Sequence, residues 1–277
     1  MKTSNPVLAR LGQAAERERA AGYAQPGPYG QPGYSPQYAP YQQYPTANAY
    51  PAAPPTVTPM TLDDVVVKTV MLLGILGASA AAAWVLVPDA LVGVAWIGAA
   101  VVGLALGLII SFSRMANPAL VVAYSIVEGV FVGMVSKAFD RLYDGIVLQA
   151  VVASFGVFFL MAMIYKARII RATPKFARIM ISIMAGLFGV MLINLVLALF
   201  GINTHLRDGS GLAIIFSLVC IVVASLSFVL NFAEIEEGVR MGLPQRYSWT
   251  AAFGIVVGLV WLYLEILRLI SYFQGDD

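Results

Sequence analysis

The sequence is poor in the residues on which soluble enzymes and metal proteins depend. Only 12% of its 277 residues are charged, and it has one histidine, His205, and one cysteine, Cys220. Soluble domains carry about twice that charged fraction, and zinc sites need several Cys or His ligands. The composition therefore argues against a soluble domain and a zinc site. A single cysteine also excludes an intrachain disulfide.

Motifs of the common enzyme classes are missing as well. The chain has no P-loop, HExxH, GxSxG or dinucleotide fingerprint. A membrane aspartyl protease needs two catalytic aspartates inside its spans, and the nearest candidates, Asp64 and Asp89, lie at span edges. Residues 1–22 lack the apolar core of a signal peptide, so we expect the first span to drive insertion. We predict no enzyme, no bound cofactor and no nucleic-acid binding.

The chain is rich in apolar residues, which make up 60% of it and gather in seven long stretches. About 20 apolar residues cross a ~30 Å hydrocarbon core as a helix. We therefore predict an all-α polytopic membrane protein, with a seven-helix transmembrane bundle over residues 61–277. The expected spans are residues 65–87, 90–113, 117–136, 145–165, 179–201, 211–231 and 248–273.

Residues 1–60 have a different composition and are predicted to form a disordered cytoplasmic tail. Residues 22–58 are rich in Tyr, Pro, Gln and Gly, a composition that does not support a packed core. Residues 5–21 read as a short amphipathic helix, with Asn5 as cap and Pro6 in the first turn. The tail is expected to be an inert tether, and binding of protein partners or of a membrane surface stays open.

Lys and Arg are unevenly distributed between the two sets of loops. Twelve fall in the tail and in the second, fourth and sixth loops, whereas three, Lys137, Arg141 and Arg207, fall in the others. Cytoplasmic loops carry the excess of positive charge. We therefore predict a multi-pass protein of the cell membrane with its N-terminus in the cytoplasm and its C-terminus outside.

Two acidic residues lie inside expected spans, Glu128 in the third and Glu265 in the seventh. A charged side chain at mid-bilayer costs at least ~2.5–3.5 kcal/mol, and such residues are functional by default. Arg268 follows Glu265 by three residues, so the two can share a helix face and pair. The functional interpretation is a water-accessible acidic site for a cation or proton. The alternative is a structural Glu265–Arg268 pair and a protonated Glu128 bonded to a neighbouring helix.

Small residues also recur in the spans. The pairs Gly103/Gly107 and Gly129/Gly133 follow the GxxxG pattern. This pattern favours close helix packing, which is our interpretation of both pairs.

Two C-terminal segments resemble the signature of the Bax-inhibitor-like family. That signature is an aromatic-Asp-x-x-x-Ile segment followed by Leu-Tyr-Leu-Asp. Here residues 228–235 read FVLNFAEI and residues 262–266 read LYLEI. The count of seven spans agrees, and the opening SNPVL with the Tyr/Pro/Gly-rich tail resembles a bacterial branch of the family.

The resemblance implies a helical bundle with the last span near its centre and a calcium-permeable leak pathway that depends on pH. In the family, two acids in the last two spans form the proton sensor, and a basic residue near the end of span two latches the closed state. Carried over, the acid positions are Asn231 and Glu265, and the latch is Arg114. Asn231 cannot ionise, so these two positions cannot share a proton. Glu234, about one turn on, is the acid that could substitute.

The sequence therefore leads to two functional hypotheses. The first is a pH-modulated calcium or cation leak channel, with no firm metal site. Its candidate cation or proton residues are Glu265, Glu128, Asn231 and Glu234, and its candidate gating residues are Arg114 and Arg268. The second is a membrane interaction protein that restrains other membrane or stress-response proteins without transport.

Overall fold

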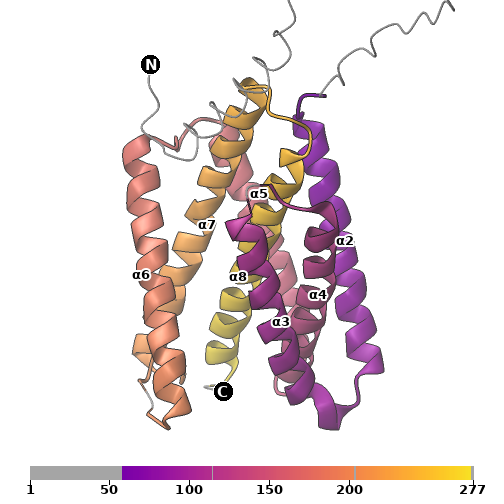
Figure 1. Ribbon diagram of the computed structural model, residues 1–277. Coiled ribbons are helices and arrows are strands. Elements are labelled where there is room, and N and C mark those ends of the chain that lie inside the picture. Colours follow the sequence, from indigo (N-terminus) through magenta and orange to yellow (C-terminus); the bar gives the residue numbers. More distant parts are fainter. Residues whose placement is uncertain (1–57, 114, 203, 276–277) are drawn as a thin grey trace, which may run out of the picture. The chain divides into compact units, whose positions relative to one another are not determined.

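The computed structural model describes residues 58–113, 115–202 and 204–275. Seven helices in this part of the chain are long and apolar enough to cross a membrane (Figure 1). They are α2 (Leu62–Leu86), α3 (Val92–Phe112, after the short 3-10 helix η1, Asp89–Leu91), α4 (Pro118–Asp140), α5 (Ile146–Lys166), α6 (Pro174–Leu199), α7 (Gly211–Arg240) and α8 (Tyr247–Gln274). The predicted all-α, seven-helix membrane fold is thereby confirmed. The expected helix at residues 5–21 and the Tyr/Pro-rich segment up to residue 57 lie outside the described residues.

Polar caps start the helices where the sequence has its breaks. At α2 the backbone N–H of Asp64 donates to Thr61 Oγ1 at 3.1 Å, and the N–H of Thr61 donates to Asp64 Oδ2 at 3.0 Å, and these two reciprocal bonds form a capping box. Asn117 and Thr173 cap α4 and α6, each followed by proline at the first helical position. Proline is favoured there because its missing N–H would have no partner in the helix.

Two helices extend well beyond the expected spans. α7 continues to Arg240 instead of ending near residue 231, and α4 continues to Asp140 instead of residue 136. Glutamate and other straight-chain polar residues are good helix formers. The change from apolar to polar sequence therefore marks where the apolar stretch ends, and the helix itself ends later.

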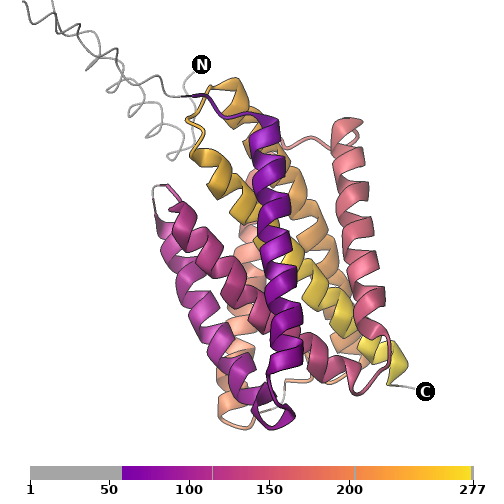
Figure 2. The same cartoon turned by 90° about the vertical axis from the view of Figure 1, so that its right-hand side faces the viewer.

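The last helix is the most buried of the seven. α8 packs against α2, α4, α5 and α7, and Figure 2 shows it running diagonally behind α2. Its buried side chains include Phe253, Val256, Leu262 and Leu267. In contrast, α6 packs only against α7 within the described part of the chain and buries only Met180 there. The resemblance had implied this central position for the last helix.

Glycines allow α2 and α4 to approach each other closely. A Cβ atom at Gly133 would lie 2.5 Å from the carbonyl oxygen of Ala80, and one at Gly129 would collide with the carbonyl oxygen of Leu76. Real Cβ atoms do not approach other atoms that closely. The Gly129/Gly133 pair is thus a packing motif, as its spacing indicated.

Residues 58–60, predicted as the end of the tail, belong to the helical unit. The N–H of Met60 donates to Leu243 O at 2.7 Å, and the N–H of Gln245 donates to Thr58 O at 2.9 Å. These bonds fasten the segment before α2 to the connection between α7 and α8. The helical unit therefore begins at Thr58, three residues before the predicted start at residue 61.

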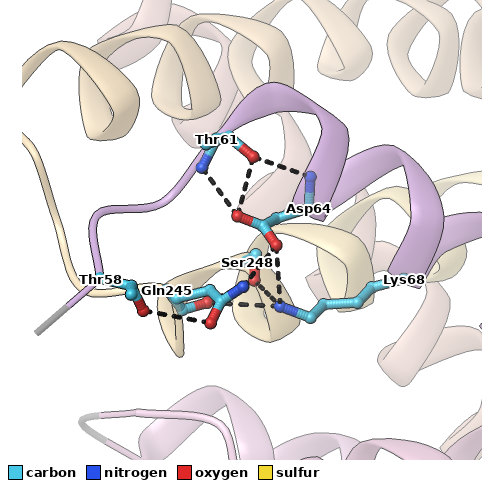
Figure 3. A network of polar contacts seen from close by, with 6 residues as sticks. All are labelled: Thr58, Thr61, Asp64, Lys68, Gln245 and Ser248. Carbon is cyan, nitrogen blue, oxygen red and sulfur yellow. Dashed lines mark hydrogen bonds and ion pairs between the residues drawn. The ribbon is translucent and has the colours of Figure 1, made fainter.

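Lys68, one turn into α2, completes this fastening (Figure 3). Its ammonium group donates to Ser248 Oγ and lies 4.0 Å from Asp64 Oδ1. The Gln245 side chain donates to the same carboxylate at 2.6 Å. The charge of Lys68, at the start of an apolar helix, is thus balanced and hydrogen-bonded by polar groups at the same end of the helical unit. We call this the Thr58 end, and the opposite end, where α6 meets α7 and α8 stops, the Gly275 end (Figure 1).

Candidate functional site

Glu265 lies on the inner face of α8, towards the Gly275 end, and only 2% of the residue is exposed. Two arginines donate to the same carboxylate oxygen, Oε1. Nη1 of Arg268 lies at 3.0 Å and Nη2 of Arg207 at 3.4 Å. The pair with Arg268, one turn further along α8, is the one that the sequence predicted. The bond with Arg207 was not predicted.

Arg207 is brought to this place by the connection between α6 and α7. The connection folds into a compact turn in which His205 and Asp208 form a side-chain pair. In addition, the N–H of Ser210 donates to Asp208 Oδ1 at 3.1 Å. Several hydrogen bonds together lower the pKa of Asp208 to about 2; the bond with the His205 ring is the largest cause, and the bonds from Ser210 contribute to the same shift. Asp208 therefore stays a carboxylate at any physiological pH.

The second carboxylate oxygen of Glu265, Oε2, accepts neither of the two arginine bonds. Oε2 is buried and makes no hydrogen bond to any described residue, and the buried hydroxyl of Tyr272, two turns along α8, is in the same condition. The side chains of Trp261 and Ser217 face the carboxyl. Buried polar atoms of this kind are normally satisfied by ordered water. The site is therefore polar enough to hold water inside the helical unit.

A hollow of about 470 Å³ adjoins the site beyond Arg207. Its walls are Met191, Asn194, Leu195 and Ala198 of α6 together with Arg207 and Asp208. One water molecule needs only about 10–15 Å³ of such space. Because the Arg207 side chain is 30% exposed while that of Glu265 is 3% exposed, Arg207 contacts the hollow on one side and the buried carboxylate on the other.

Glu128 has different surroundings on α4. It is 9% exposed, and the Tyr124 hydroxyl, one turn earlier, faces its carboxyl. On the other side lies α3, where a Cβ atom at Gly103 would come within 2.8 Å of Glu128 Oε2. Among the described residues, no Lys or Arg comes within ion-pair distance of this carboxyl. Glu128 is thus a buried acid whose visible partner is a hydroxyl.

Asn231 and Glu265, the two positions that the resemblance paired, do not meet. Nδ2 of Asn231 donates to Gly254 O at 3.4 Å, and Gly254 lies roughly 16 Å along α8 from Glu265. The reason is that α7 and α8 run antiparallel, so the late part of α7 faces the early part of α8. Glu234 lies still closer to the Thr58 end and is exposed. Neither residue can form a two-acid site with Glu265.

The remaining gating candidate, Arg114, lies outside the described residues. Arg207, which was not among the predicted candidates, contacts Glu265. The sequence does contain one indication of this contact, because the predicted orientation puts the connection between α6 and α7 on the same side of the membrane as the end of α8. Arg207 is the single Lys or Arg in residues 200–210, which makes it the natural counter-ion for an acid near that end.

A family model described as Bax inhibitor 1 like matches residues 5–275. The chain belongs to the Bax inhibitor 1-like family. Comparison with curated proteins gives no match. As a Bax inhibitor 1-like protein with seven apolar helices, it is a multi-pass protein of the lipid bilayer.

Proposed function

We propose that this Bax inhibitor 1-like protein is a cation leak pathway, with calcium as the expected ion, and that Glu265 is the site that the ion meets. The supporting observation is a buried carboxylate on the central helix, held by two arginines beside a hollow that admits water. Ionisable residues inside membranes mark ion or proton routes, and calcium prefers oxygen ligands. From the bias of Lys and Arg, we place the Gly275 end outside the cell membrane.

The number of ligands favours permeation over storage. Within the described residues, no group of three His, Cys, Asp or Glu side chains could hold a metal ion. Conduction needs binding strong enough for the ion to enter and weak enough for it to leave. One carboxylate in competition with two guanidinium groups meets that requirement, because the arginines replace a departing cation.

Protonation supplies a means of regulation. A protonated Glu265 would lose most of its attraction for Arg207 and Arg268, and a cation would then find no carboxylate. The carboxyl also has Ser217, Cys220, Trp261 and Tyr272 around it. The flux should therefore depend on pH through the charge of this one cluster.

The test is calcium flux into proteoliposomes as a function of pH for the wild type and Glu265→Gln. We expect the substitution to change the flux and to remove most of its pH dependence. Glu237→Gln is the matched control, since Glu237 also pairs with an arginine on its own helix, Arg240, but at the Thr58 end. Flux and pH response that are the same in the wild type and in Glu265→Gln would remove Glu265 from the mechanism.

The second hypothesis, an interaction protein acting through its tail, has one supporting observation. Thr58–Met60 are fastened to the connection between α7 and α8, so a partner that holds the preceding segment would pull on the two most buried helices. Deletion of residues 1–57, which leaves Thr58 in place, tests this idea. Lost cellular function with intact flux would favour it over the leak pathway.

A further inference from the structure

Two arginines hold Glu265, and they do so unequally. Arg268 donates at 3.0 Å, within the normal range for an N–H···O bond, whereas Arg207 donates at 3.4 Å, beyond it. Arg268 is fixed by its place on the same helix, one turn away. Arg207 comes from a connection between helices and is joined to Glu265 across 58 positions of sequence. The position of Arg207 therefore depends on how the connection folds, whereas the position of Arg268 is set by α8 itself.

The hollow beside α6 brings open space next to one of the groups that contact Glu265. Towards α7 the carboxyl meets Ser217 and Cys220, which are 1% and 0% exposed. On α8 it has Trp261 and Arg268 beside it. On the remaining side Arg207 separates it from the hollow of about 470 Å³. The Arg207 guanidinium thus occupies the short route between water and the buried carboxylate.

The far wall of the hollow is also the least secured part of the helical unit. α6 packs only against α7 within the described residues, and it stands at one edge in Figure 1. Its link to the connection is a bond from Asn194 Nδ2 to Thr204 Oγ1 at 2.9 Å. Phe176, near the start of α6, packs against the core that includes α8, so a small shift confined to the later part of α6 or to its connection would move Arg207.

We propose that Arg207 is a gating residue that closes the route between the hollow beside α6 and Glu265. With Arg207 in place, its charge repels cations and its side chain fills the route. With Arg207 swung into the hollow, towards Asp208, a hydrated cation reaches Glu265 directly. This inference deepens the proposed function and depends on it for the ion, but the closure of the route can be measured without any flux.

Cys220 is a built-in reporter for that measurement. It is the chain's single cysteine, it is fully buried, and its thiol lies close enough to Glu265 and Arg207 to feel both charges. A water-soluble methanethiosulfonate reagent should reach it faster when the route past Arg207 opens. Reaction with the purified, folded protein is followed by the mass added to the intact chain, and Cys220→Ser gives the background.

We expect slow labelling of the wild type and labelling that is roughly tenfold faster or more in Arg207→Ala, because the thiol reacts through local opening. Arg141→Ala is the matched control, since Arg141 also lies at the Gly275 end and pairs with an acid, Asp89. It should label as slowly as the wild type. Arg207→Lys, which keeps the charge, should restore part of the protection. A cationic and a neutral reagent separate repulsion by the charge from blocking by the side chain, and either effect supports the gate.

Two outcomes would separate the gate from the leak function. Faster labelling of Arg207→Ala with no calcium flux in any variant would keep the gate and remove the proposed function. Labelling as slow as in the wild type, with either reagent, would overturn the gate whatever the flux. If Arg207→Ala loses its native elution and melting transition, Arg207→Gln, which lacks the charge but retains a long polar side chain, takes its place. It should be labelled faster than the wild type by the cationic reagent, and labelling by that reagent as slow as in the wild type would overturn the gate.

Discussion

Two buried glutamates on neighbouring parts of the helical unit show how differently a membrane protein can hold the same side chain. Glu265 meets two arginines and lies behind a hollow that admits water. Glu128 meets a tyrosine hydroxyl and a glycine, with no cation in ion-pair distance among the described residues. A buried charge is tolerated when it is paired and is otherwise neutralised. From this comparison we expect the charge of Glu265 to matter for function, and we expect Glu128 to serve the structure.

The largest effect on this comparison is expected when Arg268, which makes the shorter of the two arginine bonds to Glu265, is replaced. Arg268→Leu leaves the carboxylate with only the longer bond to Arg207. Removal of one partner from a buried ion pair costs about 3–5 kcal/mol. The Arg268 side chain is 25% exposed, so we expect a loss near the lower end, about 3 kcal/mol in the free energy of unfolding. Reversible unfolding in mixed micelles measures it.

The control is the double variant Arg268→Leu with Glu265→Leu. When both charges are replaced by apolar groups, most of the stability should return, because no uncompensated charge remains. Glu128→Leu should behave differently from Glu265→Leu, since it leaves no arginine without its acid. If Arg268→Leu alone were as stable as the wild type, Glu265 would be neutral in the folded protein and the charge-based half of the comparison would be wrong.

A smaller effect is expected at the other glutamate. Gly103→Ala puts a methyl group 2.8 Å from Glu128 Oε2, so the carboxyl must move or α3 must shift away from α4. Overpacking of this kind costs about 1–3 kcal/mol. Gly98→Ala on the same helix is the matched control, since its Cβ would meet nothing within 4 Å, and it should gain up to about 1 kcal/mol in helix propensity. Thermal unfolding of the two variants compares the sites.

The contact that causes this loss can be removed separately. Gly103→Ala combined with Glu128→Ala should be less destabilised than the sum of the two single changes, because the clash disappears with the carboxyl. If the losses of stability in the two single variants simply added up, the methyl group at position 103 would not clash with the Glu128 carboxyl. Calcium flux should stay close to the wild-type value in Gly103→Ala if Glu128 serves the structure and not the ion.

The sequence predicted those features that depend on short-range rules. A helix must satisfy its own backbone in a membrane, so an apolar run such as residues 145–165 is enough to predict α5 within one residue at each end. The Glu265–Arg268 pair follows from i,i+3 spacing on one helix. The contact with Arg207 could not be predicted in the same way, because it depends on how the connection after α6 folds back against α8.

The separation of Asn231 from Glu265 has a related cause. A motif indicates that a residue occupies a familiar place along the chain, and it does not show which residue lies opposite. Whether Asn231 reaches Glu265 depends on the register of α7 against α8. That register follows from the length of α7 up to Arg240 and from the turn after it, which the change from apolar to polar sequence had concealed.

The smallest effect is expected for a substitution of Asp208, in the turn that carries Arg207. This substitution tests which group responds to pH. The pKa of Asp208 is lowered to about 2, mainly by its bond with His205. A lowered pKa means that the folded protein favours the carboxylate. This contribution is fully present above the ordinary value of about 4 and is lost only as the pH falls towards 2. Protonation of Asp208 therefore cannot open the route at physiological pH.

Cys220 labelling as a function of pH tests this conclusion. Asp208→Asn, which weakens the turn at every pH, should raise the labelling rate at pH 7 by less than Arg207→Ala does, since the connection keeps Arg207 but holds it less firmly. Because Asp208 is already a carboxylate between pH 5 and pH 8, any change of the wild-type rate in that range should persist in Asp208→Asn. A pH response that vanished in this variant would move the pH-sensitive step from the buried carboxyl to the turn outside it, and the contrast between Glu265 and Glu128 would then no longer explain the regulation.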